Sequence, residues 1–314
     1  MAPPTHFTLN TGAQIPSVGL GTWKSEPGEV RKAVAYALKD GYRHIDAALP
    51  QWELNPNVET GNENEVGQGI KDSGVPRQDI FITSKLWNTD HPNAAAGLQR
   101  TLDALGTDYL DLYLIHWPVR LVPNDSHPLL PVNPDGTRAV DRSWDQKKTW
   151  HQMEQLYKAG KVKAIGVANW SIPYLEELKK AWTVVPAVNQ VELHPLLPQH
   201  ELRKWCTKHG ILLEAYSPLG STGAPVMSDS VIQQIAQKNG VSAATILISY
   251  HVNMGTVVLP KSVTEKRITS NRETISLSAE DLAVLDDLAS KEGKAKRINT
   301  PLWGWDLGFS DWYS

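Results

Sequence analysis

Three ionisable residues in the sequence, Asp46, Lys85 and His116, each stand at the end of a short apolar run. Taken singly, such a residue is usually a cap or a satisfied hydrogen-bond partner. Buried charges must be paired, however, and a pairing of Asp46 with Lys85 requires the two residues to converge. An Asp, a Lys and a His brought together can polarise a carbonyl group, shift the pKa of a neighbouring acid and take part in proton transfer.

Other apolar runs also end in polar or aromatic residues. In α/β-barrel enzymes, the chemistry takes place at the carboxyl ends of the strands, so the residue just past each run is the informative one. We therefore expect a further set of residues at one end of a barrel: Gly21, Thr22, Trp23, Trp87, Trp117, Asn169, Gln190, Tyr216, Ser217, Leu219, Lys261 and Ser262.

The elements that must position these residues are short strand-like runs that alternate with longer helical stretches, a pattern that predicts parallel βαβ units. A doubly wound sheet is the alternative, but neither G-x-G-x-x-G after a strand nor a P-loop motif is present. We predict an α/β fold, a (β/α)8 TIM barrel, as a single domain over residues 1–314 with an extra C-terminal helix at Ser278–Ser290 and a tail. The eight predicted strands are Val18–Gly21, His44–Ala47, Ile80–Ser84, Leu112–Ile115, Ala164–Val167, Ala187–Val191, Leu212–Ala215 and Val257–Leu259.

Two residues predict how the second barrel helix begins. Asn62 is followed three residues later by Glu65, the spacing of a capping box. We therefore expect a helix that starts at Glu63.

The composition excludes several classes of protein. The chain has 314 residues, of which 41% are hydrophobic and 21% charged, with a formal net charge of -3. This balance disfavours disorder and nucleic-acid binding. The single cysteine, Cys206, excludes an intrachain disulfide and a multi-cysteine metal site, so we assign no metal and expect a reducing, cytoplasmic location. We expect neither a signal peptide nor a membrane span.

Long motifs in the sequence resemble the aldo-keto reductase family from about Phe7 to Asn299. They appear in the same order as in the family. The resemblance implies a (β/α)8 barrel, which agrees with the fold predicted from the strand pattern. The motifs are Gly41-Tyr-Arg-His-Ile-Asp46-Ala-Ala, Ile82-Thr-Ser-Lys85-Leu-Trp, Asp111-Leu-Tyr-Leu-Ile-His116-Trp-Pro, Gly160-Lys-Val-Lys-Ala-Ile-Gly-Val-Ala-Asn169, Asn189-Gln-Val-Glu-Leu-His-Pro195 and Leu259-Pro-Lys261-Ser-Val-Thr-Glu-Lys-Arg267-Ile-Thr-Ser-Asn271.

The resemblance implies NADP(H), bound without a Rossmann fold. Lys261, Ser262 and Arg267 match positions that hold the adenosine 2′-phosphate, Asn271 matches one that contacts the adenine, and Val263 within the same motif matches a cofactor-binding position. Bidentate Arg and a helix N-terminus suit a dianionic phosphate. At the nicotinamide end, the resemblance assigns the carboxamide to Asn169 and Gln190 and the stacked ring to Tyr216. It also places Gly21, Thr22, Trp23, Asp46, Ser217 and Leu219 in the cofactor site, whereas Ala168 replaces a serine of many relatives.

The family's catalytic tyrosine is absent from its expected place. It normally follows the aspartate by five residues and protonates the carbonyl oxygen. Here the position is Gln51 when counted from Asp46 and Thr60 when counted back from Asn62, and the segment is longer than usual. Losing a phenol matters because general acid catalysis contributes about 10²–10⁴ in rate.

Several interpretations of this absence stay open. His116 or a water held by Lys85 donates the proton, or Glu53 or Glu59 in the longer segment does so. In a third interpretation, the protein binds NADP(H) with little or no turnover, as a sensor or partner subunit. A different reaction in the same pocket is a fourth, and a splice or gene-model variant over Pro50–Thr60 is a further origin of the change.

The resemblance also predicts the substrate pocket. Trp23, Trp87, His116 and Trp117 match its wall, and Trp303 or Trp305 in the tail is placed to close it. Such a wall suits a small-molecule carbonyl substrate: aldehydes, aldoses or small ketones, reduced to alcohols by hydride transfer. We expect a monomer, although some relatives form dimers or tetramers.

Overall fold

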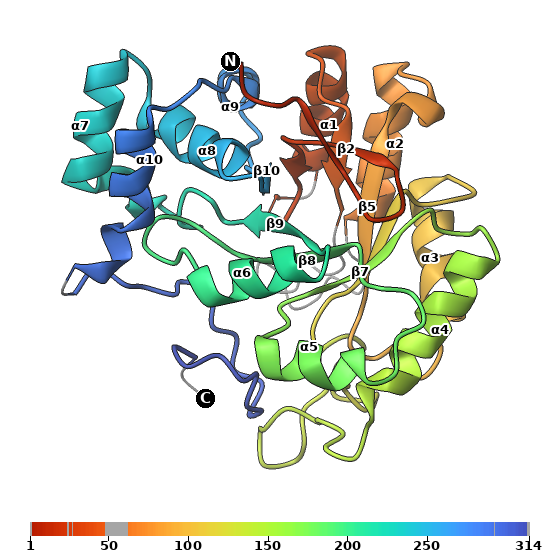
Figure 1. The fold of residues 1–314 in the computed structure, drawn as a ribbon. Helices are drawn as coiled ribbons and strands as arrows, with labels where there is room; N and C mark the ends of the chain where they lie inside the picture. Colours follow the sequence, from red (N-terminus) through yellow and green to blue (C-terminus); the bar gives the residue numbers. More distant parts are fainter. Residues whose placement is uncertain (1, 24, 27, 48–61, 292, 313–314) are drawn as a thin grey trace.

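The computed structural model describes residues 2–23, 25–26, 28–47, 62–291 and 293–312, in which strands and helices alternate along the chain (Figure 1). The strands of this part are β1 (His6–Thr8), β2 (Gln14–Pro16), β3 (Leu20–Gly21), β4 (His44–Asp46), β5 (Phe81–Leu86), β6 (Leu112–Ile115), β7 (Ile165–Ala168), β8 (Val188–Glu192), β9 (Leu212–Tyr216) and β10 (Val257–Leu259). Its α-helices are α1 (Glu29–Lys39), α2 (Glu63–Ser73), α3 (Ala94–Leu105), α4 (Gln146–Lys158), α5 (Ile172–Lys179), α6 (His200–Lys208), α7 (Ser230–Asn239), α8 (Ala243–Asn253), α9 (Glu265–Arg272) and α10 (Ala279–Asp286). Three short 3₁₀ helices are η1 (Arg77–Asp79), η2 (Pro225–Ser228) and η3 (Leu288–Ser290).

Within the described residues, the eight strands β3 to β10 form one parallel sheet in sequence order. Parallel bridges from Val18 to Val258 and from Gly21 to Lys261 join the first strand to the last, so the sheet curls into a nearly closed barrel. The predicted (β/α)8 barrel is confirmed, and the doubly wound alternative is wrong.

Alternate residues of the strands pack on opposite sides of the barrel wall. Ile45, Ile82 and Val167 point outward into the same buried cluster as helix residues such as Leu98 and Trp150. Side chains that alternate with these, such as Leu112, Leu114, Val188 and Leu259, fill the interior. Successive side chains of a strand point to opposite faces. A residue two positions from an interior residue on the same strand therefore also points into the barrel.

The antiparallel hairpin β1–β2, which we did not predict, covers the amino-terminal end of the barrel. Its strands have three residues each, too few for an alternating pattern to stand out. Leu9 and Ile15 from the hairpin are buried in the same cluster as the interior leucines. The hairpin therefore closes one end with apolar side chains, and the polar residues at the strands' carboxyl ends occupy the other.

Two local predictions are wrong. The helix expected over Ser278–Ser290 ends at Asp286, and the chain continues through Asp287 into the tighter turn η3. The helix predicted to start at Glu63 does so, but no capping box forms. Instead, Nδ2 of Asn62 donates to the carbonyl oxygen of Thr22, 2.9 Å away, and the Glu65 carboxylate accepts from Gly28 N. Long-range partners have replaced the local ones.

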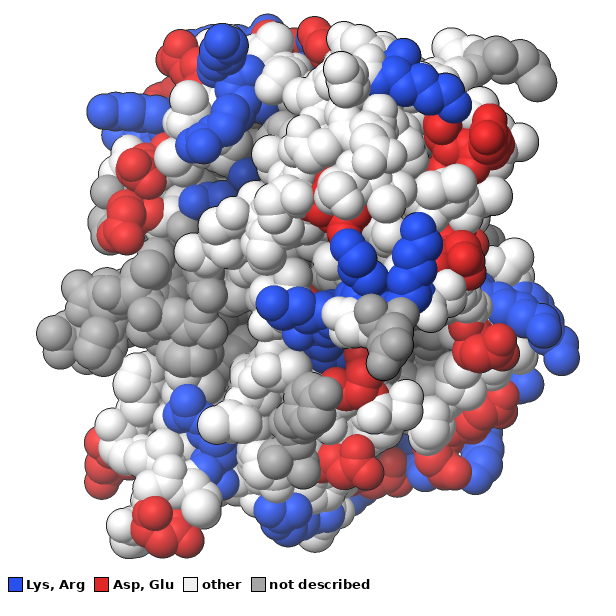
Figure 2. Space-filling view, turned by 90° about the vertical axis from the view of Figure 1, so that its left-hand side faces the viewer, with Lys and Arg blue, Asp and Glu red and all other residues white. Residues whose placement is uncertain are grey.

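The face in Figure 2 carries Lys and Arg side chains interspersed with Asp and Glu. This mixture agrees with the small formal net charge of the whole chain. Among the described residues, no helix has the length and apolar character needed to cross a membrane.

Candidate active site

Asp46 and Lys85 meet at the carboxyl ends of the adjacent strands β4 and β5. Nζ of Lys85 donates to Oδ1 of Asp46 over 2.6 Å and to the carbonyl oxygen of Ala47 over 3.0 Å. Both side chains are buried, at 2% exposure for Lys85 and 7% for Asp46. The convergence predicted from the need to pair buried charges is therefore present.

His116 lies at the end of the next strand, β6. Its backbone N–H donates to Leu86 O over 3.1 Å, which continues the pairing of β6 with β5. Its ring lies edge-on to Trp87 and stacks beside Trp117, with centroid distances of 5.3 and 6.0 Å. The three predicted catalytic residues thus come from three neighbouring strands, and the His116 ring contacts the aromatic residues.

A chain of amide hydrogen bonds continues around the barrel from His116. Nδ2 of Asn169 donates to His116 O over 3.0 Å, and the Tyr216 hydroxyl donates to Oδ1 of Asn169 over 2.8 Å. Asn169 adopts a left-handed backbone with φ of 64°, which asparagine tolerates better than most residues. Ser217, after Tyr216, is also left-handed, with φ of 49°. These turns aim the predicted nicotinamide-binding side chains at the end of the barrel.

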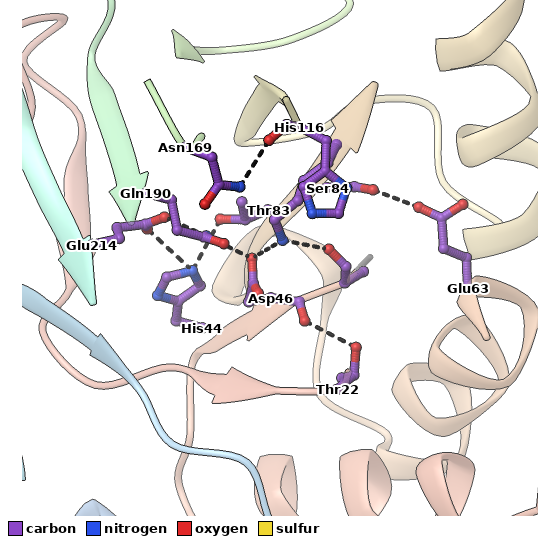
Figure 3. Close-up of polar contacts among 12 residues, drawn as sticks. Thr22, His44, Asp46, Glu63, Thr83, Ser84, His116, Asn169, Gln190 and Glu214 are labelled. Atoms are coloured by element: carbon purple, nitrogen blue, oxygen red, sulfur yellow. Dashed lines mark hydrogen bonds and ion pairs between the residues drawn. The ribbon is translucent and has the colours of Figure 1, made fainter. Parts of the chain in front are cut away.

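Gln190 links this chain to the ion pair. Its Nε2 donates to Oδ1 of Asp46 over 3.0 Å and to Oε2 of Glu214 over 2.8 Å. Gln190 therefore connects β8 with β4 and β9 across the interior of the barrel (Figure 3).

Two ionisable residues in this interior, Glu214 and His44, were missed in the sequence. Nε2 of His44 lies 3.0 Å from the Thr83 hydroxyl and 3.9 Å from Oε1 of Glu214. Burial raises the pKa of Glu214 to about 8, and the Asp46 charge adds to the rise. Burial lowers the pKa of His44 to about 4. The two-residue spacing of His44 from Asp46 and of Glu214 from Tyr216 is the signal that could have found them.

The aromatic wall is a buried cluster beside His116. Trp303, from the tail, lies 6.3 Å from Trp87 and 5.4 Å from Trp117 between ring centroids, and Trp312 lies 5.8 Å from Trp117. Trp303 and Trp305 are the two tail residues predicted to close the pocket. Trp303 is buried within the cluster, whereas Trp305 is partly buried and packs against it. Trp23 is half-buried and is not a member of this cluster. Sequence reasoning gave Trp312 no role, because aromatic residues in a tail have no period that places them.

The predicted phosphate-binding residues follow β10 and run into α9. Lys261 and Arg267 are exposed, Val263 is half-buried, and Ser262 and Asn271 are buried. Partial removal of the Lys261 ammonium from water lowers its pKa. The negative charge of Glu29 raises this pKa, and the positive charge of nearby Arg267 lowers it further. Arg267 forms no salt bridge with another described residue, and its Nη2 donates to the Thr264 hydroxyl over 2.7 Å. Two cations thus lie near the N-terminus of a helix.

The remaining predicted residues also lie at this end of the barrel. The Thr22 hydroxyl donates to Asp46 O over 2.9 Å, and Gly21 N donates to Pro260 O over 3.1 Å. Leu219 is half-buried after β9. Gln51, Thr60, Trp52 and the two glutamates Glu53 and Glu59 lie outside the described residues.

Comparison with known proteins gives the same assignment over nearly the whole chain. Residues 17–290 match the aldo/keto reductase family. Glycerol 2-dehydrogenase (NADP(+)) of Saccharomyces cerevisiae is 50% identical over 304 residues, covering 95% of this chain and 94% of the relative. D-galacturonate reductase of Hypocrea jecorina is 49% identical over 98% of each chain.

The structural comparison agrees. Aldose reductase from Schistosoma japonicum superimposes with a TM-score of 0.85 at 34% identity, covering 99% of this chain and 98% of the other. The fold, the buried ion pair and the relatives lead to one assignment: this chain belongs to the aldo/keto reductase family of oxidoreductases.

Proposed function

We propose that this protein reduces aldehydes, aldoses or small ketones to alcohols with NADPH. The observation that carries the proposal is the buried Lys85–Asp46 pair at the carboxyl end of the barrel, where the strand of Lys85 pairs with the strand that leads to His116. An ammonium held in a poorly solvated site favours negative charge that develops on a carbonyl oxygen. The aromatic cluster of Trp87, Trp117 and Trp303 supplies an apolar surface beside it.

The residues present fit the cofactor NADP(H). Lys261 and Arg267 repel one another, a repulsion that a dianionic phosphate relieves, and the N-terminus of α9 favours the same anion. At the other end, Oε1 of Gln190 and the second N–H of the Asn169 amide, which the hydrogen bonds above do not use, would hold the nicotinamide carboxamide. NADPH supplies the hydride in this chemistry.

The ion pair defines what the chain itself contributes to reduction. Among the described residues, Lys85 uses two of its three N–H groups, for Asp46 and for Ala47 O, and we propose that the third serves the carbonyl oxygen or a water. Asp46 keeps the ammonium in place. We propose that His116 or a water held by Lys85 delivers the proton in place of the family tyrosine.

The alternative is a protein that binds NADP(H) with little or no turnover. It is motivated by residues 47–61, which contain no tyrosine, next to an intact Lys261–Asn271 motif. Under this alternative, the pocket is retained for sensing or for a partner subunit.

Aldehyde-dependent oxidation of NADPH by the purified protein tests the proposal. The panel includes glyceraldehyde and D-galacturonate, with Lys85→Met and His116→Ala as the variants that lose the reaction. Turnover at background across the panel, by a folded protein that quenches its tryptophan fluorescence on binding NADPH, would overturn the reductase and favour the binding protein.

A second experiment distinguishes the reductase from the non-catalytic binding protein by exchanging the segment that lacks the tyrosine. Replacing Leu49–Thr60 by a segment of the family's usual length with its tyrosine creates or greatly raises activity if the proton donor is what limits turnover. An unchanged rate means that another donor is already competent.

We also propose that residues 1–314 form one barrel domain that acts as a monomer in the cytoplasm. The single cysteine, Cys206, supports a reducing compartment, and burial raises its pKa to about 12, so the thiol is unreactive. Light scattering on the purified chain tests the monomer.

A further inference from the structure

The side-chain amide of Gln190 is held from two sides by carboxyl groups. Its Nε2 donates one hydrogen bond to Asp46 on β4 and the other to Glu214 on β9, and all three residues are buried. An amide nitrogen carries two hydrogens, so both are used and Oε1 is left as the acceptor. Turning the amide over would set Oε1 against the Asp46 carboxylate, which has no hydrogen to donate. Figure 3 shows Gln190 between these two partners.

Glu214 faces few charged groups inside the barrel. His44 and Asp46 of β4 and Lys85 of β5 are the ionisable residues of the described interior that interact with it. On its other side, β10 contributes Val257 and Leu259 to the interior. Since the pKa is about 8 for Glu214 and about 4 for His44, both residues are mainly neutral at pH 7. A protonated Glu214 still offers a carbonyl oxygen to Gln190.

His44 has a fixed place beside Glu214. A Cβ built on Gly19 would lie 2.7 Å from Nδ1 of His44, so only glycine leaves room for the ring there. The ring is thus packed between Gly19, just before β3, and the Thr83 hydroxyl. The ring in turn lies on the side of Glu214 away from Gln190, with its Nε2 3.9 Å from Oε1 of Glu214, whereas Gln190 bonds to Oε2.

We propose that Glu214 is a positioning residue for hydride transfer, which holds Oε1 of Gln190 as the acceptor for the nicotinamide carboxamide and sets the charge next to it. This inference rests on the proposed function, because the assignment of Gln190 to the nicotinamide does. When Glu214 ionises, a second negative charge joins Asp46. The oxidised nicotinamide ring is cationic and the reduced ring is neutral, so ionised Glu214 favours NADP⁺ over NADPH.

The test is the affinity for each form of the cofactor, measured by quenching of tryptophan fluorescence over a pH range centred on about 8. In the wild-type protein, the ratio of the Kd for NADPH to the Kd for NADP⁺ rises severalfold as the pH passes this value. Glu214→Gln removes the rise because glutamine does not ionise, but keeps NADPH binding at pH 7 within about twofold of the wild type, since its carbonyl still accepts from Gln190. Glu214→Leu weakens NADPH binding by roughly tenfold, because a buried N–H of Gln190 loses its partner.

Glu63→Gln is the matched control. Glu63 is also a buried glutamate, but it bonds to Ser84 between β5 and the helices and has no contact with Gln190. This variant is expected to keep the wild-type rise.

A flat ratio in the wild type, the same rise in Glu214→Gln, or wild-type affinity in Glu214→Leu would each overturn the inference. If Glu214→Leu does not fold, the pH response of Glu214→Gln decides. A protein that binds both forms with the expected pH response and reduces no carbonyl compound contradicts the proposed reductase and leaves the role of Glu214 standing. Failure to bind either nucleotide overturns both.

Discussion

Nζ of Lys85 lies 2.6 Å from Oδ1 of Asp46, and the two side chains come from neighbouring parallel strands into a site almost closed to solvent. Removing one partner of such a pair leaves the other charge buried alone, which costs about 3–5 kcal/mol. The pair therefore contributes to the stability of the folded barrel as well as to the proposed chemistry.

We predict that Asp46→Leu lowers the free energy of unfolding by about 3–5 kcal/mol, because it orphans the Lys85 ammonium. Adding Lys85→Met to the same chain removes that charge and restores most of the loss. Urea unfolding of both single variants and the double variant measures this coupling. Equal losses that simply add in the double variant would contradict it.

A variant of Arg267 tests the proposed binding of the NADP(H) 2′-phosphate. We predict that Arg267→Ala weakens NADPH binding by about 10- to 100-fold and leaves NADH binding nearly unchanged, because charge-assisted hydrogen bonds to phosphate are each worth about 1.5–3 kcal/mol. Titration with both nucleotides measures the ratio. Lys266→Ala, an exposed cation on the same helix, is the control, and an equal loss for NADH would refute the assignment.

The positions of the barrel strands could be predicted because they are buried on both faces. The predicted Leu112–Ile115 and Val257–Leu259 coincide with β6 and β10, and other strands shift by a residue or two. The convergence of Asp46 and Lys85 followed from the physical need to pair buried charge.

The need to pair buried charge did not reveal the interior residues His44 and Glu214, although their two-residue spacing from Asp46 and Tyr216 places them on the same faces of the strands. His44 and Glu214 interrupt apolar runs, and a polar residue within a strand gives no indication of which partner satisfies it across the barrel. The capping box at Asn62 was wrong for a related reason. Its local pattern fits a helix start, but Thr22, 40 positions away, provides the partner that the side chain takes.

The aromatic tail also depends on a residue that the sequence did not single out. Glu192, at the end of β8, accepts hydrogen bonds from Ile298 N and Asn299 N, each over 2.8 Å, and from Nε2 of His194 over 3.0 Å. Burial alone raises the pKa of Glu192, but the hydrogen bonds from His194 and then the tail backbone outweigh this and keep the pKa below its ordinary value. The carboxylate thus fixes the segment that leads to Trp303.

We predict that Glu192→Gln loosens this tail, because one carboxylate oxygen is replaced by a group that cannot accept a backbone N–H. Limited proteolysis then cleaves the tail faster, and the KM for aldehydes rises more than kcat falls if Trp303 closes the substrate pocket as proposed, since Lys85 and Asp46 are untouched. Gln199→Ala, which removes only a bond to the backbone oxygen of Glu192, is the milder comparison. An unchanged tail and KM would show that Glu192 does not hold it.

The last prediction concerns Glu63, whose carboxylate accepts from the Ser84 hydroxyl in a fully buried site. Burial raises its pKa from 4.5 to about 7, against opposing hydrogen bonds and the Lys85 charge. An acid with a raised pKa in the folded state keeps its proton there after the unfolded chain has lost it. Stability due to Glu63 therefore falls as the pH rises from about 4.5 to about 7, and the full penalty persists above that window.

We expect Glu63→Gln to remove this penalty, because glutamine still accepts from Ser84 and carries no charge. Relative to the variant, the wild-type protein loses on the order of 3 kcal/mol of unfolding free energy across the window. Urea unfolding at a series of pH values measures the difference, in which other titrating groups cancel. Glu201→Gln, on the exposed surface of α6, controls for the loss of one carboxyl group elsewhere. A difference between wild type and Glu63→Gln that is independent of pH would mean that Glu63 is ionised in the folded barrel and held by a charge, rather than kept neutral by burial.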